Sequence, residues 1–564
     1  MRQDDLQHRG RGMDCLATDT LGFSLRLRAR RGACQRVEVI YACNKYEWDR
    51  NRHRMDMERI AQDSEFDYYR CEIHGSDNRL AYIFAAHAGD EIWYYSEEGL
   101  SLAFDNNYAY FNFFQYCFVH ACDVFSPLPW ADTACVYQIF PERFRNGLGD
   151  KPYINTPWYA EPTPFSFFGG DLPGITEKLE ELEALGVNCL YLTPVFPSPS
   201  NHKYDIVDYW EVDPAFGGKP ALKELITRAH ARGIRVVLDG VFNHCSSQNA
   251  LFQDVVKKGR QSPYYDWFLI DGDFPDERKG NYSMFAAVRY MPRLNTGHPE
   301  VIDYFCRVAS YWIREMDADG WRLDVCDEIS DCFLRSLRRA VKGAKPDALL
   351  LGEIWHEPAH WLGGDMLDGV MNYALTKACL DYMALETLSA QGFCDRLLRS
   401  LWRCPEPAAR MALNLVGSHD TDRFLSRVRG SKGLLKMGYA AVFFMPGMAC
   451  VYYGDEVGLS GGYDPGCRKG YPWEESRQDK ALRAFIQALY SLKKQPALSV
   501  GAFNAFVENG MAVLERSSPG QTARLYMNKT GGEKQSAWGV AVPRNECRVL
   551  VRTGAEGFAV LPEA

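Results

Sequence analysis

The sequence predicts an α/β protein: a (β/α)₈ barrel with a long loop domain after its third strand, an N-terminal β-sandwich and a C-terminal β-sheet domain. Three observations support this fold class. Polar and apolar residues alternate between Leu21 and Tyr95, short apolar runs alternate with helical segments from Ala131 onward, and β-like runs return after Ala497. With 564 residues, the chain is also too long for one ordinary core.

The N-terminal segment has a period of two that recurs at short intervals. The runs are SLRLRAR, RVEVIYA, YYRCEIH, LAYIFAAH and EIWYYS. Such alternation is typical of half-buried strands in a β-sandwich. We therefore expect an N-terminal sandwich domain over residues 1–126.

The central segment contains eight short apolar runs, each of which we expect to be a barrel strand. In order they are CVYQIF, CLYLTPVF, RVVLDGVFN, GWRLDV, LLLGEIW, GVMNY, MALNLVGSHD and ACVYYG. Segments of helical period lie between them, such as ITEKLEELEALG, ALKELITRAHARG and VIDYFCRVASYWIREMD. Eight strands alternating with helices predict a parallel barrel over residues 127–496.

Two further regions complete the organisation. The third connection, 245–297, is rich in Tyr, Phe, Asp and Pro and has little clear helix, and so long a loop in a compact domain is usually functional. The last part contains AFNAFVEN, MAVLERS and TARLYMN, which predict a small C-terminal β domain over residues 497–564.

Composition and charge exclude several classes of partner. The net charge of −9 gives no basic patch for nucleic acid. The longest apolar run, Met437 to Tyr453, is interrupted by Pro446 and Gly447 and is shorter than the roughly 20 residues that span a bilayer. We expect a helix, a turn and a strand there, and no membrane association.

The cysteines indicate a reducing compartment. The chain has 18 cysteines without a CxxC pair, and its first residues, MRQDDLQHRGRGMDC, lack the apolar segment of a signal peptide. Unpatterned thiols of this number favour the cytoplasm over an oxidising compartment. No organic cofactor is expected.

Polar residues follow four of the predicted barrel strands. In such barrels the catalytic groups stand at the C-terminal ends of the strands. Strand three ends with Asp239, Asn243 and His244, and strand four ends with Arg322 and Asp324. Strand five ends with Glu353, and strand seven ends with His419 and Asp420. These side chains should therefore meet at one rim.

Arg322 and Asp324 are two residues apart, so in a strand they point to the same side. The arginine could hold the aspartate ionised as a nucleophile, while Glu353 serves as acid and base and Asp420 grips the substrate. Two working carboxylates are what cleavage of a glycosidic bond requires. An ion-pair network that closes the barrel rim explains any one of these residues equally well.

Four ordered motifs then carry a resemblance to a known family. DGVFNH, GWRLDVCDE, GEIW and GSHD, together with YQIFPERF, HKYDIVDY and MPRLN, resemble the α-amylase family of glycoside hydrolases from Ala131 to about Pro496. The resemblance implies that Asp324 is the nucleophile, Glu353 the general acid/base and Asp420 the transition-state stabiliser. The residues that it implies in substrate binding are His202, Tyr204, Asp205, His244, Arg322, which would orient the nucleophile, and His419.

Within the family, the chain looks most like cyclomaltodextrinases, neopullulanases and maltogenic amylases. They share an N-terminal β-sandwich and a loop like GGYDPGCRKGYPW, where Asp464 and Arg468 would contact substrate. The resemblance implies that a homodimer hydrolyses α-1,4 glucosidic bonds in cyclodextrins, pullulan and maltooligosaccharides with retention, and also transglycosylates. It leaves cleavage of α-1,6 bonds open. Alternatives are an ordinary α-amylase, an α-1,6-glucosidase, or a non-catalytic glucan-binding or transporter-associated barrel. Such modules typically lose catalytic carboxylates or gain a membrane anchor, and this chain does neither.

The sequence departs from this subgroup at two places. Asp327 replaces the asparagine of a VANE motif after the nucleophile. The loop FRNGLGDKP is poorer in calcium ligands than its counterparts, although Asn146, Asp150, Gly169 and Asp171 could bind calcium through oxygen atoms. A plain turn beside FFGGDL explains these four residues equally well.

Overall fold

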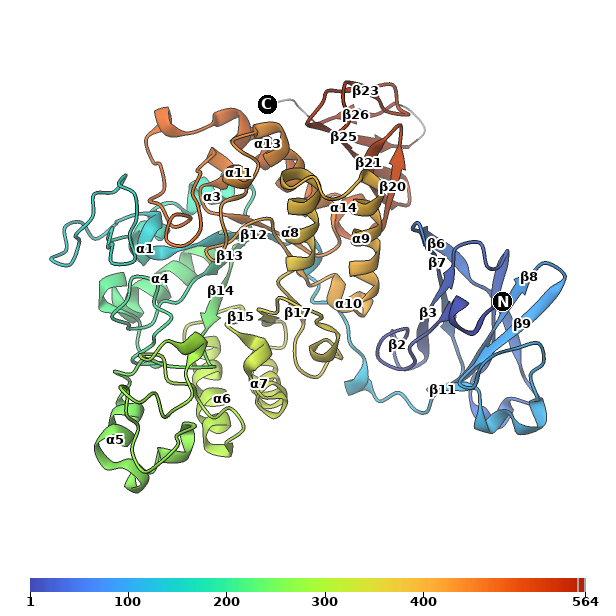
Figure 1. Cartoon of the computed structure of the whole chain (residues 1–564), viewed down its shortest axis with the longest axis horizontal. Helices are drawn as coiled ribbons and strands as arrows, with labels where there is room; N and C mark the ends of the chain where they lie inside the picture. The colour runs from blue at the N-terminus through green and yellow to red at the C-terminus, as the bar shows by residue number, and fades with distance from the viewer. Residues whose placement is uncertain (555–556, 562–564) are drawn as a thin grey trace.

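The computed structural model describes residues 1–554 and 557–561, and three sheet-containing regions follow one another along the chain (Figure 1). The first consists of two antiparallel sheets with strand orders β1-β3-β7-β6 and β10-β9-β8-β4-β5, to which β2 and β11 add at β3 and β8. Their strands are β1 (Leu6–Gln7), β2 (Cys15–Ala17), β3 (Gly22–Arg30), β4 (Arg36–Ala42), β5 (His53–Asp56), β6 (Glu58–Gln62), β7 (Phe66–His74), β8 (Leu80–Ala88), β9 (Glu91–Ser96), β10 (Gly99–Ser101) and β11 (Phe114–Tyr116).

Alternate residues of the two sheets meet in a shared core, as the sequence predicts, and the other face of the second sheet is covered by Trp48 and Phe113. Leu25 and Leu27 of β3 share a core with Val37 and Val39 of β4 and Phe84 of β8. Each of these side chains is removed from water, which is the main force that holds two such sheets together.

The central region is an eight-stranded parallel sheet with the order β17-β16-β15-β14-β13-β12-β19-β18, and the bridge between Met371 and Leu413 joins its two ends. The (β/α)₈ barrel is confirmed, and each predicted run contains one strand. The strands are β12 (Cys135–Ile139), β13 (Cys189–Leu192), β14 (Arg235–Gly240), β15 (Gly320–Leu323), β16 (Leu349–Gly352), β17 (Gly369–Val370), β18 (Leu413–Asn414) and β19 (Met448–Tyr452).

The helices between these strands form the outer layer of the barrel (Figure 1). The longest, α6, buries Val301, Phe305 and Trp312 on one face, as its helical period predicts. In the run Met437 to Tyr453, α12 gives way to Gly447 at φ 114° and then to β19, so the expected helix, turn and strand are confirmed. The main helices are α1 (Pro141–Phe144), α4 (Gly218–His230), α6 (Pro299–Arg314), α7 (Asp331–Ala344), α8 (Tyr373–Cys379), α9 (Ala390–Trp402), α10 (Glu406–Ala409), α11 (Phe424–Arg427), α12 (Lys432–Phe444) and α13 (Lys480–Lys493).

Two helical segments differ from the prediction. The stretch ITEKLEELEALG is divided into α2 (Leu172–Glu177) and α3 (Leu179–Leu185), because Lys178 has a ψ of 6° and leaves the helical region. The third connection contains the helix α5 (Ala250–Lys258), which the sequence analysis missed. Asn249 caps α5 by accepting the Leu251 backbone N–H, so the helix begins at a residue typical of helix starts.

The last region is an antiparallel sheet with the order β20-β21-β22-β25-β26 and a separate pair, β23 and β24. A short helix, α14 (Pro496–Ser499), precedes it, and the expected boundary at 496/497 falls inside this helix; both domain boundaries stay predictions. The strands are β20 (Ala502–Glu508), β21 (Met511–Ser518), β22 (Gln521–Asn528), β23 (Lys534–Gln535), β24 (Ala541–Val542), β25 (Glu546–Thr553) and β26 (Ala559–Val560).

The N-terminal sheets lie beside the barrel, next to α9 and α10 (Figure 1). The Ser64 hydroxyl donates to Asp395 of α9 over 2.5 Å, and Arg70 Nη1 lies 2.8 Å from Glu406 Oε2 of α10. In the described residues no helix is long and apolar enough to cross a bilayer.

Candidate active site

Arg322 lies at the centre of a cluster of carboxyl groups at the C-terminal ends of β14, β15 and β16. The parallel register of β14 and β15 places Asp239 directly beside Arg322. Arg322 Nη1 donates to Asp239 Oδ1 over 2.9 Å and to Asp324 Oδ1 over 2.9 Å. The expectation that Arg322 and Asp324 face the same side is confirmed.

Glu353 joins the same guanidinium from the next strand. Its Oε2 lies 2.9 Å from Arg322 Nη2 and accepts the Val325 backbone N–H over 2.9 Å, while Oε1 accepts the Trp355 indole N–H over 3.2 Å. One buried arginine therefore sets the positions of Asp324 and Glu353 relative to each other.

The residue after Asp324 has an unusual backbone. Val325 has φ 46° and ψ 46°, a left-handed conformation that is costly for a β-branched residue. This turn ends the strand at once and aims the Val325 N–H at Glu353. The strain therefore falls at the point where the two carboxyl groups are brought together.

Burial raises the pKa of Asp324 well above its ordinary value, and the nearby carboxyls of Glu353, Asp239 and Asp420 raise it further, whereas Arg322 lowers it. Burial likewise raises the pKa of Asp239 to about 6, against the opposing effect of Arg322. Arg322 therefore opposes the rise in the Asp324 pKa but does not outweigh the burial of Asp324 and the repulsion from its neighbours. That the arginine holds Asp324 ionised as a nucleophile stays a prediction.

His419 and Asp420 face this cluster from the end of β18. The Tyr204 ring stacks on the His419 ring at 5.4 Å with an interplanar angle of 3°, and its hydroxyl donates to Asp239 over 2.9 Å. His419 Nε2 lies 3.1 Å from Asp420 Oδ2. Burial holds the pKa of His419 well below its usual value, so the ring is neutral and can act as a hydrogen-bond donor.

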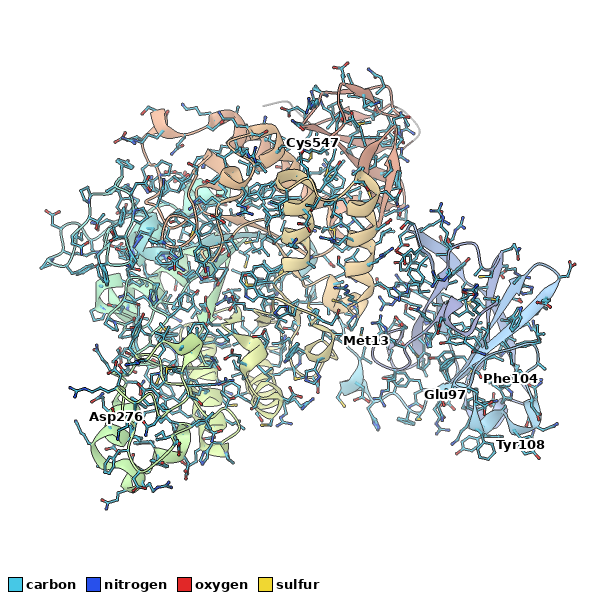
Figure 2. All side chains as sticks on the ribbon, viewed as in Figure 1. Met13, Glu97, Phe104, Tyr108, Asp276 and Cys547 are labelled. Carbon is cyan, nitrogen blue, oxygen red and sulfur yellow. The ribbon has the colours of Figure 1, made fainter. Side chains whose placement is uncertain are left out.

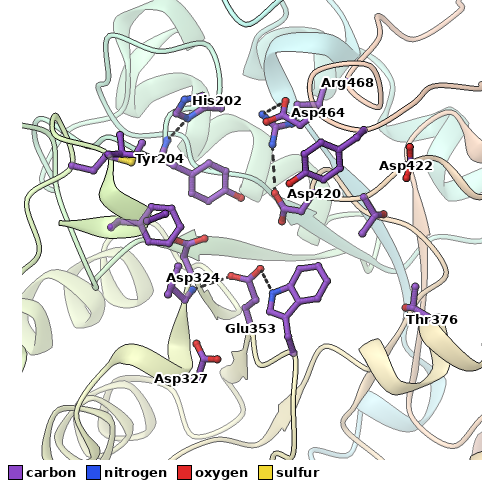
Figure 3. Close-up of a pocket in the computed structure, with 18 of the residues that line it drawn as sticks. His202, Tyr204, Asp324, Asp327, Glu353, Thr376, Asp420, Asp422, Asp464 and Arg468 are labelled. Carbon is purple, nitrogen blue, oxygen red and sulfur yellow. Dashed lines mark hydrogen bonds and ion pairs between the residues drawn. The ribbon is translucent and has the colours of Figure 1, made fainter.

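Arg468 fixes Asp420 from the opposite side. Its Nη2 donates to Asp420 Oδ1 over 3.4 Å, its Nη1 lies 2.9 Å from Asp464 Oδ1, and its Nε donates to the His419 carbonyl over 2.9 Å. The loop after β19 thereby holds the third carboxyl group opposite Asp324 and Glu353 (Figure 3).

These residues line a cavity of about 830 Å³ at the barrel mouth. Eight of the predicted site residues reach its surface, namely His202, Tyr204, His244, Asp324, Glu353, Asp420, Asp464 and Arg468. Arg322 and His419 are buried and do not line the cavity, but Arg322 contacts Asp324 and His419 lies 3.1 Å from Asp420. A cavity of this volume holds several sugar rings, and carboxyl, imidazole and guanidinium groups converge on its floor.

Two histidines offer hydrogen bonds to the cavity. The Tyr204 backbone N–H donates to His202 Nδ1 over 3.1 Å, so the His202 proton is on Nε2. His244 Nε2 is buried without a hydrogen-bond partner in the protein. Burial lowers the pKa of both histidines to about 3, and both are therefore neutral above that pH.

Asp205 does not line the cavity, unlike the other residues expected in its loop. Its carboxylate accepts hydrogen bonds from the Ser198 hydroxyl, over 2.6 Å, and from the Ser200 hydroxyl. The Ser200 oxygen also lies 3.1 Å from His202 Nδ1. Asp205 therefore supports the loop that presents His202, and its predicted contact with substrate stays a prediction.

Sequence reasoning missed several wall residues. Trp355 is 45% exposed and stacks on Tyr373 with ring centroids 3.6 Å apart, and Tyr463 is 68% exposed beside Asp464. Trp355 lies in the motif GEIW and Tyr463 in GGYDPGCR. Their closeness in sequence to Glu353 and Asp464 could therefore have predicted that they line the cavity. Exposed aromatic faces in a polar cavity are suited to stacking on sugar rings.

Two of the four residues expected as calcium ligands, Gly169 and Asp171, bind a lysine instead. Lys151 Nζ donates to the Gly169 carbonyl over 2.6 Å and to Asp171 Oδ2 over 2.7 Å, and Asn146 bonds to the backbone of Gly149. Asp150 is exposed. With this ammonium among them the residues do not fit a calcium ion, and the described part of the chain contains no group of three His, Cys, Asp or Glu side chains that could hold a metal.

Comparisons with known proteins agree with this geometry. The family model described as "Alpha amylase, catalytic domain" matches residues 138–497, and "Alpha amylase, N-terminal ig-like domain" matches residues 1–120. A cyclomaltodextrinase of Geobacillus thermopakistaniensis is 45% identical over 88% of this chain and 85% of its own length. Neopullulanase 2 of Thermoactinomyces vulgaris is 38% identical over 94% of this chain and 91% of its own. A solved cyclomaltodextrinase structure superposes with a TM-score of 0.89 at 40% identity, over 95% of this chain and 92% of the other.

Proposed function

For a chain that belongs to the alpha-amylase family and is a glycoside hydrolase, we propose the retaining hydrolysis of α-glucosidic bonds in cyclodextrins, pullulan and maltooligosaccharides. One observation supports the proposal above all: Arg322 holds Asp324 and Glu353 at 2.9 Å each on the floor of one cavity. Two carboxyl groups fixed in this way can act in turn on one glycosidic bond.

In the proposed first step, an Asp324 oxygen attacks the anomeric carbon and forms a glycosyl ester, while the bond from that carbon to the leaving oxygen breaks. Glu353 gives its proton to the leaving oxygen. In the second step Glu353 takes a proton from water, the water oxygen attacks the anomeric carbon, and the ester bond to Asp324 breaks. Two inversions return the α-configuration. Transglycosylation follows when a sugar hydroxyl replaces the water.

Asp420 and the neutral histidines are proposed to bind the sugar at the cleavage point. Asp420 is held by Arg468, and its anion would stabilise positive charge that develops on the sugar ring. The unpartnered Nε2 of His244 would meet a hydroxyl of the sugar. A sugar that fills these positions satisfies groups that are otherwise costly to bury.

Removal of each carboxyl group distinguishes its role. With α-maltosyl fluoride and azide, Asp324→Ala should give β-maltosyl azide, because azide then attacks from the face of the missing nucleophile. Glu353→Ala should give α-maltosyl azide, because Asp324 still forms the ester and azide replaces it. Without azide, both variants should lose roughly 10²–10⁴-fold or more in kcat on maltooligosaccharides.

An exposed carboxylate of α6 provides the control. Asp303→Asn changes a side chain that is 70% exposed, far from the proposed machinery, and should keep the parental rate. An α-azide from Asp324→Ala together with a β-azide from Glu353→Ala would refute the assignment of Asp324 and Glu353. Near-parental activity of either alanine variant would also refute it.

We further propose that the enzyme is a cytoplasmic homodimer. All eighteen cysteines are free thiols, which agrees with a reducing compartment. Every cavity-lining residue found in the described chain lies between His202 and Arg468, so the N-terminal sheets do not cover the cavity of their own chain. A partner's sheets would have to do so.

The N-terminal sheets carry an exposed aromatic patch that is suited to this role. Tyr46 and Tyr108 are each 64% exposed and Phe111 is 79% exposed. Tyr108 lies at the outer end of the sheets, away from the barrel of the same chain (Figure 2). Exposed aromatic side chains of this kind are typical of protein interfaces.

A further inference from the structure

We propose that the buried Lys151 ammonium stabilises the segment between α1 and α2, residues 145–171, as a bound cation would. The stability of the protein is then independent of calcium. The ammonium bonds to Gly169 and Asp171, two of the residues that the sequence offers as calcium ligands. The inference concerns stability and is independent of the proposed roles of Asp324 and Glu353.

The Lys151 ammonium is built into the protein. Its side chain is only 9% exposed, and the carboxylate of Asp171 that receives it is fully buried. The second acceptor is the carbonyl of Gly169, which has φ 85°. A Cβ at Gly169 would lie 2.4 Å from Ile154 Cδ1, so only glycine can present its carbonyl to Lys151 in this way.

Backbone N–H groups occupy the other hydrogen-bond acceptor positions of the Asp171 carboxylate. Its Oδ1 accepts the Gly174 N–H over 2.7 Å and the Gly147 N–H over 3.0 Å, and its Oδ2 accepts the Leu148 N–H over 2.9 Å beside Lys151. Calcium requires about six to eight oxygen ligands at about 2.3–2.6 Å. Here two oxygens face the cation, and the Tyr153 ring lies 5.9 Å from Nζ.

The charges in this region also balance without a metal. Asp171 pairs with Lys151, and the neighbouring buried Glu142 pairs with Arg143. A calcium ion added to these two pairs would bring two positive charges that no carboxylate compensates. Charges buried without compensation are strongly destabilising.

The segment that Lys151 anchors contributes the Ser166 carbonyl, which connects it through Arg143 of α1 and through Asn201 to two loops of the cavity. Arg143 Nη1 donates to the Arg468 carbonyl over 2.8 Å and Nη2 to the Ser166 carbonyl over 2.8 Å. Asn201 Nδ2 donates to the same Ser166 carbonyl over 3.0 Å, next to His202. The ammonium therefore stabilises a backbone framework on which Arg468 and His202 depend.

Calcium dependence of the parent protein tests the inference first. Its thermal midpoint should agree within about 1 °C in 5 mM EDTA and in 5 mM CaCl₂, and metal analysis after dialysis against calcium should find far less than one calcium per chain. A midpoint that falls in EDTA and recovers with calcium, or one retained calcium per chain, would overturn it.

Substitution of the lysine gives the complementary test. Lys151→Met should lower the thermal midpoint by about 5 °C or more, because Asp171 stays buried without its cation. The control Lys258→Met removes a lysine that is 54% exposed and pairs with Asp254, so its midpoint should change by about 1 °C or less. Equal shifts for the two variants would contradict the assigned role.

A smaller side chain removes the ammonium without adding a calcium ligand. In Lys151→Ala, the Asp171 carboxylate and the Gly169 carbonyl face the vacated space. Because two oxygens are too few for calcium, 5 mM CaCl₂ should leave the midpoint of this variant, like that of the parent, unchanged. A midpoint of Lys151→Ala that calcium raises would contradict the argument that these residues do not fit calcium.

Discussion

Asp324 is surrounded by more negative charge than Arg322 neutralises. Glu353, Asp239 and Asp420 are all close enough to raise its pKa, and burial raises it more than any of them. The guanidinium restrains this rise and fixes the geometry. A nucleophile in such surroundings is poised to lose its negative charge on attack, since the glycosyl ester is neutral.

The raised pKa of Asp324 predicts the acidic limb of the pH profile. Asp324 must be ionised to attack, and a raised pKa means that it gains its proton at a higher pH than an ordinary aspartate. As the pH falls, kcat/KM on maltotriose should therefore decline with an apparent pKa above the ordinary aspartate value of about 3.9. An acidic limb at or below pH 3.9 would contradict this account.

A histidine variant identifies the group that titrates. The pKa of His244 is about 3 because the ring is buried, so His244 stays neutral throughout the acidic limb. His244→Asn should lower kcat/KM but leave the position of the limb unchanged. A shift of the limb toward neutral or acidic pH in this variant would assign it to the histidine instead of Asp324.

At the scale of the element, the rim residues could be predicted because strand ends are a local property. An apolar run followed by Asp, Glu or His needs no knowledge of the rest of the fold. The register that pairs Asp239 with Arg322 is different, because it depends on how β14 and β15 align. The mutual repulsion of the carboxyl groups was therefore out of reach from the sequence.

Other features were missed for the same reason. Lys151 lies in the loop FRNGLGDKP, for which the sequence predicts a weak calcium site, and only the folded segment brings its ammonium to Gly169 and Asp171. The helix α5 was missed because its buried face is narrow: only Phe252 and Val255 are fully buried. Nothing in the sequence around Val325 predicts that its backbone is left-handed.

At the scale of the whole molecule, the N-terminal sheets and the cavity of one chain do not meet. The sheets pack beside α9 and α10, whereas the cavity opens at the barrel mouth. Removal of the whole N-terminal region would expose the apolar side chains that pack against it. Substitutions in the exposed aromatic patch test the proposed dimer more cleanly.

We predict that the full-length chain sediments as a dimer and that Tyr108→Asp with Phe111→Asp is monomeric. The parent should prefer β-cyclodextrin to soluble starch in kcat/KM, because a covered mouth admits small glucans more readily than a long polymer. The monomeric variant should lose this preference. As a control, Leu385→Asp, a barrel residue that is 50% exposed, should leave both properties unchanged.

A parent protein that sediments as a monomer would refute the proposed dimer. A parent that prefers soluble starch, or a monomeric variant with an unchanged substrate ratio, would refute a covered cavity mouth and favour an ordinary α-amylase.

Capture of the glycosyl ester tests the central claim most directly. In Glu353→Gln, α-maltosyl fluoride can still react with Asp324, because fluoride departs without an acid, but water then lacks its general base. The ester should accumulate, and mass spectrometry of the digested protein should find one maltosyl group on Asp324. A maltosyl group on another carboxylate, or an unlabelled protein that releases β-maltose first, would contradict retaining catalysis by Asp324.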